Sequence, residues 1–140
     1  MIKTLLKEND YSRIINLSLL ILRLGIAILM LTHGIPKLGK LISGDLNFPD
    51  PIGLGSTASL ILTIFAEVIC SLLVAAGLGT KLAVIPLIIT MSVILFIVHV
   101  DEPIMNHYNV LIYLLGYILL LLTGSGRYSF GFYLQQRNRG

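Results

Sequence analysis

Charged residues are scarce in this chain of 140 residues. Lysine, arginine, aspartate and glutamate together make up 12% of the sequence, and a soluble domain carries roughly twice that share. Hydrophobic residues make up 56%, and the mean hydropathy is +0.91. This balance excludes a soluble globular, disordered or collagen-like chain, and it predicts a protein whose solvent is the lipid bilayer.

Cysteine is almost absent, and tryptophan is missing altogether. The single cysteine, Cys70, excludes an intrachain disulfide, a paired-cysteine redox motif and a structural zinc site. The sequence also contains no haem-attachment motif and no glycine-rich phosphate loop. We therefore expect no intrinsic cofactor and no metal site, so that any redox chemistry would use a borrowed cofactor such as a quinone.

Apolar runs of about twenty residues are what the sequence has in abundance. A run of this length crosses roughly 30 Å of hydrocarbon, and with no water in the bilayer core it must be helical. We predict an all-α integral membrane protein, a four-transmembrane-helix bundle formed by one domain over residues 1–140. Pro103 behind Asp101 could start the last helix early. The predicted spans are residues 14–33, 57–77, 82–100 and 108–123.

The basic residues that flank these spans predict the topology. The first span is too long for a signal peptide and lacks a small-residue cleavage pattern, so we expect it to be retained. Basic residues flanking the spans concentrate on the cytoplasmic side, which predicts both termini inside a bacterial cytoplasmic membrane. One side receives Lys3, Lys7, Arg13, Lys81, Arg127, Arg137 and Arg139, whereas the other receives Lys37 and Lys40.

Two ionisable residues, Arg23 and Glu67, lie deep inside predicted spans. Each alone would cost roughly 2.5 to 3.5 kcal/mol on insertion scales, so we expect the two to face each other inside the bundle. One interpretation is a buried ion pair that fixes the register of the two helices. The other is a site for a substrate, a quinone or a proton.

Small and polar residues share helix faces around this pair. Thr63 and Ser71 flank Glu67 at steps of four, and Tyr113 and Tyr117 recur on the last helix. In a bilayer such a face favours helix packing, and the alternative is that these side chains line a ligand site. Gly34 on the first helix is expected to admit a close neighbour.

A second polar group is expected at the outer side, where the three histidines of the chain lie near helix ends. These residues either cap helices at the interface or converge on an outward-facing pocket. A metal site is disfavoured, because no two histidines have the helical spacing that shared ligation favours. The group consists of His33, Lys37, His99, Asp101, Glu102 and His107.

Several motifs resemble those of the DoxX family of small four-helix bacterial membrane proteins, which has DoxD-like relatives. The resemblance runs from about Leu17 to Leu134, and it departs from the family pattern at Ser125, Phe130, Gly131, Tyr108 and Asn109. The matching residues are Arg23-Leu24-Gly25, His33-Gly34, Lys37-Leu38, Glu67, Ala76 to Lys81, His99, Asp101, Pro103 and Gly124 to Ser129.

The resemblance implies an accessory membrane subunit of a quinone-linked redox complex that handles sulfur or oxidative stress. A noncatalytic membrane scaffold or assembly factor is the second hypothesis. A small proton-coupled transporter that uses Glu67 is the third. The expected partners are the lipid bilayer, protein subunits of a membrane complex and further copies of the chain, without nucleic acid.

Overall fold

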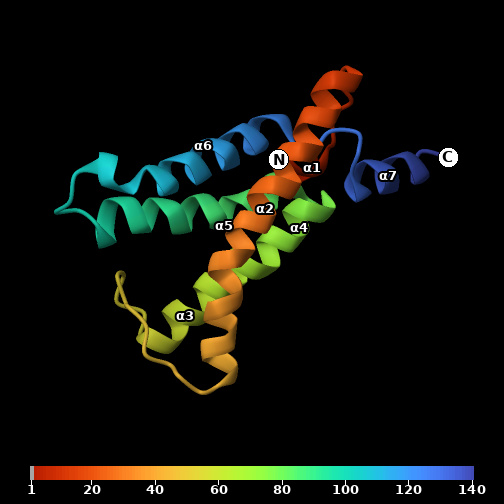
Figure 1. Ribbon diagram of the computed structural model, residues 1–140. Helices are drawn as coiled ribbons and strands as arrows, with labels where there is room; N and C mark the ends of the chain where they lie inside the picture. The colour runs from red at the N-terminus through yellow and green to blue at the C-terminus, as the bar shows by residue number, and fades with distance from the viewer. Residues whose placement is uncertain (1) are drawn as a thin grey trace.

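The computed structural model describes residues 2–140, which form helices and connecting loops without a strand (Figure 1). Four helical stretches in this part of the chain are long and apolar enough to cross a membrane. The prediction of an all-α, four-span membrane protein is therefore confirmed. The four stretches are Arg13–Ile42, Ser56–Ala76, Thr80–Val98 and Ile104–Thr123.

The first span is helix α2, Arg13–Ile42, and it is longer than the apolar run indicated. Its N-cap is Ser12, whose hydroxyl accepts a bond from the Ile15 amide at 3.5 Å. The helix continues past the predicted span end at His33 and through Pro36, which removes one backbone hydrogen bond and crowds the carbonyl four residues earlier. Thirty residues at 1.5 Å each give about 45 Å, so α2 extends beyond the hydrocarbon.

The second and third spans each contain a π-helical turn. Helix α3 (Ser56–Ile64) continues through the π-helix η1 (Phe65–Cys70) into α4 (Ser71–Ala76). Helix α5 (Thr80–Val93) likewise ends in the π-helix η2 (Ile94–Val98). π-Helical turns are rare and frequently occur at functional sites.

The fourth span begins with the 3₁₀-helix η3 (Ile104–His107) and continues as α6 (Tyr108–Thr123). Pro103 stands at the N-cap of η3, so it does not start an α-helix early as expected.

Two short helices, which the sequence did not reveal, flank the spans: α1 (Ile2–Leu6) and α7 (Phe130–Arg137). Helix α7 is capped by the Ser129 hydroxyl, which accepts a bond from the Phe132 amide at 3.1 Å.

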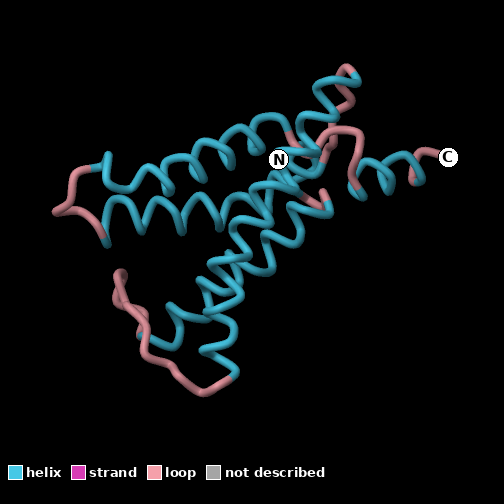
Figure 2. The backbone as a smooth tube through the Cα atoms, viewed as in Figure 1, coloured by secondary structure: helices cyan, strands magenta, loops and turns pink. Residues whose placement is uncertain are grey.

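The spans form two antiparallel hairpins, one of α2 with α3–η1–α4 and one of α5 with α6 (Figures 1 and 2). The hairpins lie close together where α1, α7 and the turn at residues 77–79 meet, which we call the termini end. They diverge toward the connections at residues 43–55 and 99–103, which we call the loop end. The molecule is therefore packed at the termini end and opens toward the loop end.

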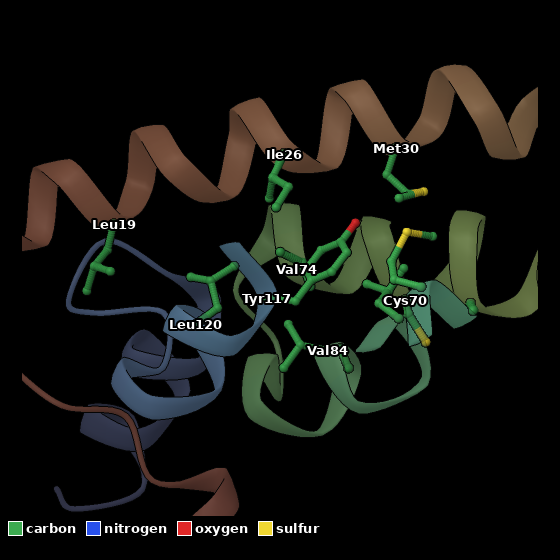
Figure 3. Packing of buried hydrophobic residues seen from close by; sticks show 12 residues of the cluster. Leu19, Ile26, Met30, Cys70, Val74, Val84, Tyr117 and Leu120 are labelled. Atoms are coloured by element: carbon green, nitrogen blue, oxygen red, sulfur yellow. The ribbon is translucent and has the colours of Figure 1, made fainter. Parts of the chain in front are cut away.

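The core between the hairpins is built from side chains of every span. Figure 3 shows them pointing toward a common centre around Tyr117, which is 1% exposed. The core also includes Leu19, Ile26, Met30, Cys70, Val74, Val84 and Leu120.

Gly34 is a point of close approach between α2 and the second span. A methyl group there would lie 2.8 Å from a Val68 side-chain carbon and 3.0 Å from the backbone of Glu67. This confirms the prediction of a close neighbour at Gly34.

Candidate functional site

Arg23 is fully buried, but its partners are backbone oxygens rather than Glu67. Its guanidinium donates to the Ser125 carbonyl at 3.1 Å and to the Tyr128 carbonyl at 2.8 Å. Both carbonyls belong to the segment between α6 and α7. The predicted Arg23–Glu67 pair is therefore wrong.

Glu67 instead forms an ion pair with Lys37, one of the residues predicted for the outer polar group. The Lys37 ammonium donates to the two Glu67 carboxylate oxygens at 2.8 and 2.6 Å. The Glu67 side chain is 2% exposed and that of Lys37 is 26% exposed. Lys37 thus reaches inward as a counter-ion and does not act as a plain interfacial anchor.

The register of the α2 hairpin explains both partnerships. In this antiparallel pair Gly34 lies against Glu67 and Val68, and Arg23 lies against Gly77. Gly77 has φ +72°, and a Cβ there would lie 2.5 Å from the Arg23 guanidinium, so only glycine fits. Arg23 and Glu67 are thus separated along α2 by about three turns, roughly 16 Å.

A buried carboxylate that the sequence did not single out, Glu8, stabilises the termini end. It is 3% exposed, and its carboxylate accepts a bond from the Ser125 amide at 3.0 Å. Its backbone and the Gln135 side chain exchange two further bonds, at 3.0 and 3.1 Å. Glu8 therefore ties the N-terminal segment to α7 and to the loop that holds Arg23.

The loop end contains a pocket of about 540 Å³ between the diverging hairpins. Its walls are mostly apolar, and both π-helical turns contribute to them through residues such as Phe65 and Ile94. Lys37, Ser59, Thr63, Thr90 and His99 supply the polar groups. A mostly apolar pocket of this size with a few polar groups is typical of small-molecule sites.

The connection at residues 43–55 covers one side of this pocket with Phe48, Pro49, Pro51 and Ile52. Asp50 fixes it: its carboxylate accepts bonds from the Leu54 and Gly55 amides, both at 2.8 Å, and from the Ser59 hydroxyl at 3.0 Å. These bonds, that of Gly55 foremost, lower the pKa of Asp50 below its usual value. The loop is thereby attached to the start of α3.

Two of the three histidines converge at the loop end. His99 and His107 stack with ring centroids 4.0 Å apart, and each places a ring nitrogen near the Glu102 carboxylate, at 3.4 and 2.8 Å. These contacts, with His107 first, lower the pKa of Glu102. His33 lies apart, edge-on to Tyr113 at 5.9 Å. Asp101 is exposed and outside the cluster.

The remaining candidates divide between the pocket and the core. Thr63 lines the pocket. Ser71 and Tyr117 are buried in the core, where their hydroxyls have no partner among the described residues. Tyr113 stacks on Tyr117 with centroids 6.2 Å apart. None of these three side chains lines the pocket at the loop end.

Comparison with known proteins supports the resemblance drawn from the motifs. The DoxX family model matches residues 18–100, which include Arg23, Lys37, Glu67 and His99. The closing motif at residues 124–129, where the sequence departs from the family pattern, lies outside the match. No curated protein and no solved structure matches the chain. Since the matched segment spans more than half of its length, this multi-pass membrane protein belongs to the DoxX family.

Proposed function

We propose that the chain is an accessory membrane subunit of a redox complex and that its pocket at the loop end binds the quinone of that complex. The observation that carries the proposal is the pocket itself, a mostly apolar cavity of about 540 Å³. Its few polar groups include Lys37, which forms an ion pair with the buried Glu67. A quinone matches this combination of surfaces, because it has a long apolar body and two carbonyl groups that accept hydrogen bonds.

The pocket walls fit the apolar part of such a ligand. Leu62, Phe65 and Ile89 line the pocket and are also about half exposed at the protein surface. In a membrane this surface faces lipid, because these residues lie on spanning helices. A lipid-soluble ligand could therefore enter from the bilayer, without crossing the water layer.

Lys37 fits the carbonyl end of the ligand. An ammonium group has three donors, and the Glu67 carboxylate accepts two of them. The third remains for a ligand carbonyl at the pocket wall, and the His99 ring offers a second polar contact. The chemistry supplied by a quinone is two-electron, two-proton acceptance. Glu67 positions Lys37, and the electron donor belongs to a partner subunit.

Lipid extraction tests this proposal. The full chain purified in mild detergent should retain quinone detectable by mass spectrometry of the extracted lipids. Thr63→Phe, which fills the pocket, should lower the retained amount at least tenfold. Thr32→Phe is the matched control, because Thr32 also donates its hydroxyl to an α-helical carbonyl but is exposed outside the pocket.

Equal retention in both variants, or no quinone in the native chain, would overturn the proposal. A partner protein that co-purifies without quinone would then support the scaffold hypothesis. Proton-coupled uptake into liposomes that Glu67→Gln abolishes would support the transporter.

We further propose that the termini end faces the cytoplasm of a bacterial inner membrane, which the charge bias supports. The N-terminal segment, the turn at residues 77–79 and α7 lie together at this end (Figure 1). In a Cys70→Ser background, an impermeant thiol reagent should label Asn47→Cys from outside the cell but not Asn138→Cys. The reverse labelling would overturn this orientation.

A further inference from the structure

We propose that His99, Glu102 and His107 form a binding site for one divalent transition-metal ion, with Zn²⁺ as the ion to test. The site lies at the loop end, in and beside the connection between the third and fourth spans. It does not depend on the quinone proposal, although His99 belongs to both the metal site and the pocket wall.

The three side chains offer one ligand atom each within a small volume. These atoms all lie within 4.8 Å of one another. The separations from the Glu102 oxygens are 3.4 Å to His99 Nδ1 and 2.8 Å to His107 Nε2. Ligands 2.0–2.1 Å from a tetrahedral zinc ion lie about 3.3 Å apart. The most widely separated ligand atoms must therefore approach by up to about 1.5 Å to surround an ion, which side-chain rotation can supply.

The donor set is one that transition metals prefer. Imidazole nitrogen suits zinc, copper, nickel and iron, whereas Mg²⁺ and Ca²⁺ prefer sites made of oxygen alone. Two histidines and one carboxylate leave a further coordination position for water or another ligand, as in zinc sites that are not closed by protein groups. A site of this composition is distinct from the closed cysteine-rich site that the sequence excludes.

The backbone holds the three ligands in place without metal. The Glu102 amide donates to the His99 carbonyl at 3.1 Å, and the Asn106 amide donates to the Pro103 carbonyl at 3.0 Å. The backbone of this turn is therefore ordered before an ion binds, so binding costs less conformational entropy than it would in a flexible loop. The rings are stacked with an interplanar angle of 22°, so one of them must turn for both nitrogen lone pairs, which lie in the ring planes, to reach one ion.

Glu102 is also free of the cations that would compete with a metal. Within residues 2–140, the groups that pair with its carboxylate are the two histidines, and neither a lysine nor an arginine does so. Its side chain is 53% exposed, whereas that of His107 is 15% exposed. An ion can thus reach the carboxylate from solvent and be held against a partly buried imidazole.

Calorimetric titration of the full, tag-free chain in detergent tests this site. After treatment with a chelator, the chain should bind one equivalent of Zn²⁺, and Co²⁺ should give the visible absorption bands of a low-symmetry site. His107→Gln and Glu102→Gln should each weaken Zn²⁺ binding at least tenfold. Thr63→Phe should leave it unchanged, which separates this site from the pocket.

Two control variants are matched to the ligands. Asp101→Asn removes an acidic charge next to Glu102, and His33→Gln removes the histidine that lies outside the cluster. Both should bind Zn²⁺ as the native chain does. Thermal melting of each metal-free variant establishes that the ligand substitutions leave the fold intact. No Zn²⁺ binding by the native chain, or an equal loss in the control variants, would overturn the proposal.

Discussion

The two ends of the bundle use buried charge in opposite ways. At the termini end, Arg23 is 1% exposed, and its guanidinium donates to two backbone carbonyls. At the loop end, the Lys37 ammonium is held by Glu67 but also lines an open pocket. Arg23 therefore ties α2 to the segment between α6 and α7, whereas one Lys37 donor remains available to a ligand.

The difference shows that a charged residue in a membrane span does not by itself identify a binding site. Both residues are costly to place in hydrocarbon, and both have partners. What separates them is the kind of partner, because both cations border a cavity. Arg23 borders one of about 430 Å³ and is held by two backbone carbonyls, whereas Lys37 borders one of about 540 Å³ and is held by a single carboxylate.

Replacing Arg23 should have the largest effect on stability. Arg23→Leu leaves the Ser125 and Tyr128 carbonyls without donors, and the buried one, that of Ser125, costs about 1–3 kcal/mol when unpaired. We expect a sharp fall in the melting temperature in detergent. Arg23→Lys keeps the charge but loses the planar two-pronged donor, so its loss should be intermediate. If Arg23→Leu melted at the same temperature as the native chain, Arg23 would not stabilise the termini end.

Breaking the Lys37–Glu67 pair should lower stability less than replacing Arg23 does, and the loss should depend on which partner is replaced. Lys37→Gln leaves a carboxylate that is 2% exposed without its counter-ion, at a cost of about 3 kcal/mol. Glu67→Gln should cost only about 1 kcal/mol, because the longer lysine side chain can turn toward the exposed side.

The double variant Lys37→Gln, Glu67→Gln provides the control for this pair. Its chemical denaturation should show a smaller loss than the Lys37 variant alone, because no charge is left unpaired. Strictly additive losses would mean that the two residues do not interact.

Releasing the loop over the pocket should have the smallest effect. The pKa of Asp50 is lowered in the folded protein, so its stabilising contribution is complete above the ordinary value of about 3.9 and is lost as the pH falls through the lowered value. Asp50→Asn should therefore speed hydrogen exchange at the Leu54 and Gly55 amides at neutral pH, and the difference from the native chain should shrink in acid.

Asp45→Asn is the matched control for the loop, because Asp45 is exposed in the same connection and accepts a bond from the Asn47 amide. It should leave exchange at Leu54 and Gly55 unchanged. Equal acceleration in both variants would mean that general loop charge, rather than the Asp50 cap, holds the connection.

The spans and the close approach at Gly34 could be predicted from sequence because each depends on composition along one segment. The partners of Arg23 could not, because carbonyl oxygens belong to every residue and those of Ser125 and Tyr128 lie more than a hundred positions away. The Arg23–Glu67 prediction failed because it assumed that the ends of the two spans lie level, whereas Arg23, inside α2, lies against Gly77 at the end of the second span.

The proposed metal ligands and the pocket show a second limit of prediction from sequence. The sequence placed His99, Glu102 and His107 in one outer group of six residues, but because they lack helical spacing only the turn between the third and fourth spans shows which members converge. The pocket depends on the angle between two hairpins, and packing in the core determines that angle rather than any local motif. The family resemblance confirmed by the comparison did not supply either feature.

The π-helical turn at Phe65–Cys70 has a geometric consequence for the whole second span. Such a turn contains one residue more than an α-helical turn, so it rotates everything that follows by about 100° about the helix axis. The direction in which Gly77 faces Arg23 is therefore set partly by the winding at Glu67. Deleting one residue from this turn would restore α-helical winding and rotate Gly77 away from the Arg23 guanidinium. A change at the loop end would therefore alter the packing at the termini end through the second span.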